Sequence, residues 1–487
     1  MTRNNSLRGW WKPWTWSTRR WIVAITLSAL ASPFVTRWIC LWQIPDVVLP
    51  IDVEDVVQDS VHDEQNAFKV YEHVLTMLAG KLPAANNSRT NATAAPAEIT
   101  REELLQRLSS HNEQAMAEFI RAGKMKWAVG ESARTAGISA DLSLHFQLRQ
   151  LANYFGSLGE TLEECGEIEK AWIAHRANVQ LSIHAEQPGF AICVVFGIAI
   201  RKDISKPLAH WAANPTVTAE QLRAARQDIA SEFAKRVTVF TINKCEYLFA
   251  RNTLREISGV QLLQGLEFLD SSLGKNTSRS KLQFDAIKAL LWCIGQPELM
   301  LRLNRQILLN NTTELDKPLH LRRHSTSAHN ELIFERDPVV PPIHGQLAAT
   351  DLVQILTNDS ALLRMTQSCL STIGSLDEAL RRDAARFACL TVLFAAQEFQ
   401  RQRGQYPASL EELVPTYLDE VPFDPMDPQG LPIQYRREAE GTAIVWSAAL
   451  DGVDDQSETK ANDFTSRNHL DVRFVIKVND PIHDSPQ

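Results

Sequence analysis

The chain has 487 residues with a formal net charge of −8, and 44% of its residues are hydrophobic and 22% charged. This length exceeds what one small core needs, so two or three globular domains are expected. Phosphate binding needs clustered lysine and arginine, so an acidic chain without a basic domain is not expected to have nucleic acid as its partner. The seven cysteines lie far apart and form no CxxC pair, which argues against a zinc knuckle or a thioredoxin-like site.

The N-terminus has the pattern of a membrane anchor. Residues 1–20 form a basic, tryptophan-rich tail without an acidic residue, and the uncharged stretch Trp21–Val35 follows. Those 15 residues are fewer than the ~20 of a usual span. Arg37 can extend to the interface, and Trp38 and Trp42 suit an interfacial belt, so we predict a single transmembrane helix at 21–44. The basic flank predicts an inner-membrane protein with a cytoplasmic N-terminus and its bulk in the periplasm or outside.

Two alternatives to the anchor stay open. Ala29-Leu30-Ala31 after a short apolar core resembles the cleavage site of a signal peptide. The same stretch could also be a buried helix of a soluble protein, although the one-sided charge and the clustered tryptophans favour export. Residues 45–62 are acidic and contain two prolines, which predicts an extended stalk.

Residues 63–310 are predicted to form an α-helical body. Its clearest periodicity belongs to Leu144, Leu148, Leu151, Phe155, Leu158 and Leu162, and Gly166 ends that pattern before a second apolar helix. The pair predicts an antiparallel hairpin of tetratricopeptide type, with no second copy at a fixed period. The apolar run Gly189–Ile200 is too short for a second span and predicts a buried core helix. Thr218 and Gln221 have the spacing of a capping box.

The candidate catalytic groups in the body are acids without a recognised motif. Glu163, Glu164, Glu167 and Glu169 surround a predicted helix end, where a solvated face is the simpler expectation. Residues 311–350 form an irregular linker rich in proline and histidine. His320 and His324 lie four residues apart, but Arg322 and Arg323 between them oppose a metal cation.

Residues 351–487 are predicted to form a long helix followed by a small α+β module. The helix covers Leu376–Arg403, and Gly404 ends it. Ser409 and Glu412 have capping-box spacing before a short helix, and an Asp/Pro-rich loop follows. Strands are expected at 433–437, 442–448 and 470–474, so the fold class is mainly α with a small C-terminal α+β module and a single N-terminal transmembrane helix.

The C-terminal pattern resembles the C-terminal domain of the type II secretion major pseudopilin. The shared features are a long helix ending in Gly-x-Tyr-Pro, a Leu-x-x-Leu-Val-Pro segment, an Asp-Pro pair, a hairpin and an Asp-Gly-x-Asp-Asp loop, within 376–476. The whole chain is most similar to uncharacterised planctomycete-type membrane-anchored proteins with this module behind a helical region. Those also tend to have a Glu-Asn-Ala start after the stalk, which is Gln65-Asn66-Ala67 here.

The resemblance implies a structural calcium ion. Its ligands would be Asp451, Asp454 and Asp455, with Ser447 or a nearby carbonyl as a further ligand. Three carboxylates within five residues suit a hard, oxygen-binding cation. This chain departs from the family pattern, because Gln456-Ser457 replaces the usual Gly-Gly and a polar insertion follows. An acidic, solvent-facing turn without metal is therefore the alternative.

The sequence thus predicts a single-pass, extracytoplasmic, non-enzymatic protein of the cell envelope. We expect it to act as a scaffold or protein-interaction component, with an unidentified protein partner. A type II secretion or pilus-related component and an envelope enzyme are the alternatives.

Overall fold

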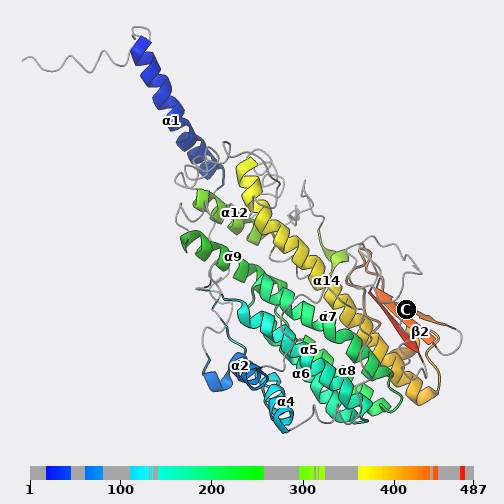
Figure 1. The fold of residues 1–487 in the computed structure, drawn as a ribbon. Coiled ribbons are helices and arrows are strands. Elements are labelled where there is room, and N and C mark those ends of the chain that lie inside the picture. Colours follow the sequence, from blue (N-terminus) through cyan, green and yellow to red (C-terminus); the bar gives the residue numbers. More distant parts are fainter. Residues whose placement is uncertain are drawn as a thin grey trace, which may run out of the picture.

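The computed structural model describes residues 18–44, 46, 61–79, 110–130, 132, 134, 136, 141–256, 296–311, 314–315, 317–323, 360–438, 442–447 and 472–477. The protein is mainly helical with a small antiparallel sheet, as predicted (Figure 1). The helices are α1 (Thr18–Gln43), α2 (Ala67–Met77), α4 (Ser110–Gly123), α5 (Ser143–Glu164), α6 (Ile168–Glu186), α7 (Ala191–Ala213), α8 (Ala219–Phe233), α9 (Val239–Glu256), α12 (Gln296–Asn311) and α14 (Ser360–Arg403). Short 3₁₀ turns are η2 (Asp63–Gln65), η4 (Leu319–Leu321) and η5 (Leu410–Leu413), and the strands are β1 (Gln434–Arg437), β2 (Thr442–Ser447) and β3 (Val472–Lys477).

Helix α1 corrects one prediction. Within the described ranges, no helix is sufficiently long and apolar for a membrane crossing, so the transmembrane helix predicted at 21–44 is not supported. The physical reason is visible in the sequence, because Arg37 interrupts the apolar stretch of α1 and the polar residues Thr26, Ser28, Ser32 and Thr36 lower its hydropathy. The helix projects from the body (Figure 1). Just after its C-terminal end, the Ile44 carbonyl accepts a hydrogen bond from Arg302 of α12 at 3.3 Å.

The hairpin of α5 and α6 matches the prediction. Gly166 adopts a φ of +80°, which the left-handed end of a helix requires and which favours glycine. The N–H of Glu167 then reaches back to the Leu162 carbonyl at 2.8 Å, which closes the end of α5. Ala171 and Ala174 are fully buried, as expected for small residues that let the two helices approach.

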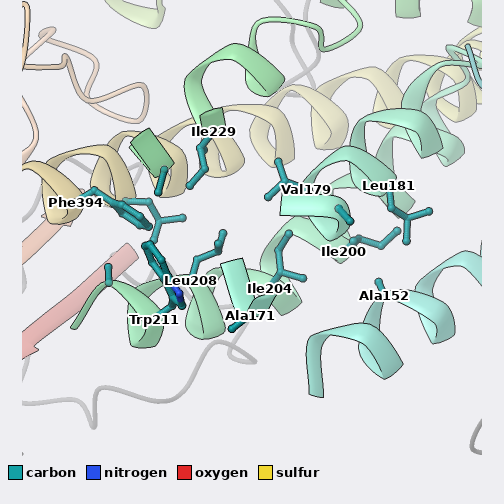
Figure 2. Close-up of a cluster of buried hydrophobic side chains, with 14 of the residues drawn as sticks. Ala152, Ala171, Val179, Leu181, Ile200, Ile204, Leu208, Trp211, Ile229 and Phe394 are labelled. Atoms are coloured by element: carbon teal, nitrogen blue, oxygen red, sulfur yellow. The ribbon is translucent and has the colours of Figure 1, made fainter. Parts of the chain in front are cut away.

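Helix α7 is the central helix of the body, and it is longer than its apolar run. It continues through Pro207 to Ala213, whereas the sequence pattern ended at Ile200. Gly197 allows its close approach to α6, because a Cβ at this position would lie 2.5 Å from Cγ of Glu186. Figure 2 shows the resulting core, where Ile200, Ile204, Leu208 and Trp211 of α7 lie among side chains of neighbouring helices.

The long helix α14 connects the helical body to the sheet. It runs beside α7 and α8 and then packs against β2 and β3 (Figure 1). Phe394 of α14 lies 6.2 Å from the Trp211 ring, and Phe387 stacks on Phe233 of α8 at 3.8 Å. One continuous hydrophobic cluster therefore contains residues from both 63–310 and 351–487.

The C-terminal elements follow the predicted order with two differences. Helix α14 ends at Arg403, before Gly404 with its φ of +80°, but it begins at Ser360 rather than near Leu376. The predicted capping box at Ser409 does not form, because the Ser409 side chain makes no cap bond and the short helix is a 3₁₀ turn. The strand order is β1-β2-β3, with Tyr435 opposite Val445 and Val445 opposite Phe474.

Asn66 has a structural role at the start of the body. Its Oδ1 caps α2 by accepting from the Phe68 N–H at 3.1 Å, and it also accepts from the Val129 N–H at 3.0 Å. Its Nδ2 donates to the Val129 carbonyl at 2.8 Å. A single side chain thus fixes both the first turn of α2 and the segment that follows α4.

Candidate functional site

The candidate site is a buried carboxylate held between two imidazoles. Glu163, in the last turn of α5, has its Oε1 2.7 Å from Nε2 of His175 on α6. Its Oε2 lies 3.0 Å from Nδ1 of His210 on α7. The side chains of Glu163 and His175 are almost fully buried, whereas 38% of the His210 side chain is exposed. The constellation therefore opens to solvent on its His210 side.

Close packing of α5 against α6 places His175. Gly159 lies one turn before Glu163, and a Cβ there would stand 2.7 Å from Cε1 of the His175 ring. The absent side chain gives the imidazole its space. The Trp211 indole, next to His210, donates to the Ile168 carbonyl at 3.2 Å, which holds the end of α7 against the start of α6.

The electrostatics favour a charged pair between Glu163 and His210. Burial opposes the charge on Glu163, but hydrogen bonds from His175 and His210 together bring its pKa below the usual value. The hydrogen bond to Glu163 raises the pKa of His210, although burial opposes this. An anionic Glu163 then accepts from both rings, and Nδ1 of His175 is buried with no hydrogen-bond partner.

Two further charged groups adjoin the site. Glu160 precedes Glu163 by one turn of α5, and partial desolvation raises its pKa. Lys206 lies one turn before His210 on α7 and interacts favourably with Glu160. With Nδ1 bound to Glu163, Nε2 of His210 is the atom placed to exchange a proton with solvent or with a bound molecule.

The structure separates the four acids that the sequence placed together. Glu163 is buried, while Glu164, Glu167 and Glu169 are exposed as expected for a solvated face. Sequence reasoning missed His175 and His210, which lie 12 and 47 residues from Glu163. The only local signal was His175 in a predicted helix, because His210 lies beyond the predicted helix Gly189–Ile200, and the packing of α6 and α7 on α5 was needed to bring the two histidines to Glu163.

The predicted calcium ligands Asp451, Asp454 and Asp455 lie outside the described residues. Ser447, the further ligand considered for that site, is buried and donates to Oδ1 of Asp424 at 2.7 Å. His320 packs on Gly430, and His324 lies outside the described residues. In the parts of the chain that the structure covers, no three His, Cys, Asp or Glu side chains are grouped so as to hold a metal ion.

The fold and site define a mainly helical protein with a carboxylate and two histidines at the junction of three helices. The chain matches no known protein-family model, no curated protein and no solved structure.

Proposed function

We propose that this protein is a membrane-associated helical scaffold, a protein-interaction component of the cell envelope. The observation that carries the proposal is the exposed apolar surface of α1. Its apolar side chains with more than 40% of their surface exposed are Trp21, Ile22, Val23, Ile25, Leu27, Leu30, Val35, Trp38 and Ile39.

A lipid surface is the environment that suits these side chains. Soluble proteins rarely expose contiguous apolar patches of this extent. Tryptophans near both ends, Trp21 and Trp38, suit the membrane–water interface, as does the basic flank at Arg19 and Arg20. The proposal requires that α1 is embedded in lipid. The inner membrane as its location and the cytoplasm as the side of its N-terminus remain predictions.

Membrane fractionation of the full chain tests the lipid contact. We expect Ile25→Asp combined with Leu30→Asp to move most of the protein from the membrane pellet to the supernatant after alkaline extraction. Phe146→Asp is a matched control, because Phe146 on α5 is 62% exposed and Leu30 is 63% exposed. An unchanged distribution of the double variant would exclude α1 as the membrane contact.

The body offers a surface for a protein partner. Phe146 of α5 packs edge-on against Phe196 of α7 with ring centroids 4.7 Å apart. Ile192 and Val195, within one turn of Phe196, are 44% and 43% exposed. Exposed apolar groups that gather across two helices favour a protein-interaction site. The tetratricopeptide-like shape predicted for the α5–α6 hairpin supports the same function.

A pull-down from detergent extracts tests the interaction. We expect one protein to be retained in stoichiometric amount by the full chain and lost on Phe146→Ser. The exposed polar change Gln147→Ser on the same helix is the control. A chain that stays solitary in the extract argues against the scaffold function.

The buried carboxylate supports a second candidate, an envelope enzyme that uses His210 as a general acid or base. Glu163 holds the ring and favours its charged form, as carboxylates do for catalytic histidines. Hydrolysis of a panel of chromogenic esters and glycosides tests this candidate. We expect His210→Gln to abolish any activity that the wild type shows, and activity that survives the change would remove His210 from consideration.

A type II secretion or pilus-related component rests on the resemblance of the C-terminal module alone. Shared fold transfers function poorly, so this remains the weaker alternative. Mass spectrometry of the mature N-terminus decides it, because cleavage by a prepilin peptidase is expected for such a component.

A further inference from the structure

A second group of buried charges lies where α6, α7, α8 and α14 meet. Arg201 of α7 donates from Nε to Oδ2 of Asp383 on α14 at 2.8 Å, and from Nη2 to Oε1 of Glu186 on α6. Arg236, just after α8, approaches the same two acids, with Nη2 3.4 Å from Asp383 and Nε 3.5 Å from Glu186. The two carboxylates are thus shared by two guanidinium groups.

Arg386 adds a third guanidinium to this group. It lies one turn after Asp383 on α14 and is only 5% exposed. The nearest carboxylate oxygen, Oδ1 of Asp383, is 3.5 Å from its Nη1. Both Nε and Nη1 of Arg386 are buried and make no hydrogen bond. Three guanidinium groups therefore face two carboxylates among the described residues.

Among the described residues, no neighbouring carboxylate accepts a hydrogen bond from Nε or Nη1 of Arg386. Arg382, one turn before Arg386, is itself paired with Glu378 at 2.7 Å. Asp424 accepts hydrogen bonds from Ser447 and from the Met426 N–H. Burial and the nearby Arg201 and Arg382 lower the pKa of Arg386, although Asp383 opposes this. A guanidinium keeps its proton in proteins, so the positive charge persists.

A buried, persistent charge without a hydrogen-bonded partner is costly. A small anion beside Arg386 would accept hydrogen bonds from the two N–H groups that no other atom accepts from. The forked N–H donors of a guanidinium are well suited to bind such an anion. We propose that Arg386 is an anion-binding site that takes a small monovalent inorganic anion such as chloride, and that this anion completes the junction between α14 and the helical body.

Chloride itself is the probe, with gluconate as a bulky replacement at matched ionic strength. We expect the full-length protein to melt about 1–2 °C higher in chloride than in gluconate, since a ligand that binds only the folded state stabilises it. We also expect the chloride NMR line to broaden in proportion to the protein concentration.

Two variants locate the effect. Arg386→Met should lose both the chloride-dependent shift and the line broadening, and in gluconate it should be at least as stable as the wild type because the buried N–H groups without an acceptor are gone. Arg382→Met, which removes the same charge one turn away, should keep the chloride response.

The proposal fails if the wild type melts at the same temperature in both salts and leaves the chloride line unchanged. It also fails if Arg386→Met retains the response of the wild type. The first comparison needs no variant, so a variant that does not fold would leave the proposal testable.

Discussion

Glu163 illustrates how much a single residue depends on its surroundings. Its neighbours Glu164 and Glu167 are exposed, yet Glu163 faces the junction of α5, α6 and α7 and accepts from two histidines. A buried carboxylate is tolerated only when it is paired, and here each oxygen has its own imidazole partner. The two hydrogen bonds also connect three helices through one side chain.

Replacing Glu163 should therefore destabilise the fold. We expect Glu163→Gln to lower the free energy of unfolding by about 1–3 kcal/mol, because the amide cannot accept from both rings and leaves a buried group unsatisfied. Urea denaturation measures the change. Glu164→Gln on the exposed side of the same turn is the control, and an equal loss in both variants would contradict a special role for Glu163.

The same pair predicts a pH dependence. The pKa of His210 is raised above its usual 6.5, so its contribution to stability is complete below that pH and is lost as pH rises through the raised value. The pKa of Glu163 is lowered from 4.5, so its contribution is present above 4.5 and is lost as pH falls through the lowered value.

We therefore expect the stability difference between wild type and His210→Gln to be largest between pH 4.5 and 6.5. Denaturation curves across pH 4 to 9 measure it. His73→Gln, at an exposed position of α2, should give no such window. A difference that grows above the raised pKa of His210 would show that the imidazolium is not the stabilising form.

At the scale of the element, local sequence signals predicted where helices begin or end better than they predicted how long the helices are. The predicted capping box at the start of α8 forms. The Gln221 N–H donates to Oγ1 of Thr218 at 3.2 Å, and the Thr218 N–H donates to Oε1 of Gln221 at 2.9 Å. Gly166 and Gly404 end their helices through positive φ. Helix α7 continues through Pro207, because packing against α5, α6 and α14 outweighs the cost of proline in a helix.

Helix packing makes two glycines respond in opposite ways. We expect Gly197→Ala to cost about 1–3 kcal/mol, because its Cβ would lie 2.5 Å from Glu186 and 2.7 Å from the Ser182 carbonyl oxygen. Gly156→Ala should instead stabilise by about 0.5–1 kcal/mol, because its nearest neighbour is 3.7 Å away and alanine favours the helix. Urea denaturation of both variants checks the contrast, which fails if the two changes have the same sign.

At the scale of the whole molecule, α14 decides the architecture. Its first described side chains pack with α7 and α9, and its last turns contact the sheet. Arg401 near its end donates to the carbonyl of Ala213, the last residue of α7, and to the carbonyls of Asn214 and Val217 just after it. Helix α14 is thus attached to the end of α7 by hydrogen bonds to backbone carbonyls, and the sheet is attached to the helical body by packing against α14.

The calcium prediction also belongs to this scale, because a bound ion would stabilise the module at the end of α14. If Asp451, Asp454 and Asp455 bind calcium, we expect chelation to lower the melting temperature of the protein and added calcium to restore it. Thermal melting with and without chelator measures this. The triple change to asparagine should remove the response, and an unchanged midpoint in the wild type would leave the acidic turn without metal.

The sequence alone determined the mainly helical class, the α5–α6 hairpin, the capping box at Thr218, the end of α14 at Gly404 and the approximate positions of the three strands. Each rests on a local pattern, because apolar spacing, capping residues and glycine act within a few residues of themselves. The same local reasoning predicted that α1 spans a membrane, but the apolar stretch of α1 is too short to support this prediction.

Only the tertiary structure decided which of the charged residues are buried and with whom. Glu163 meets His210 from 47 residues away, and Arg201 meets Asp383 from 182 residues away. Such pairs cannot be predicted from the spacing of residues in the sequence, because they form where α5, α6, α7 and α14 pack together. The physical reason is that a helix pattern specifies a face, whereas the partner of that face is chosen by packing of the whole chain.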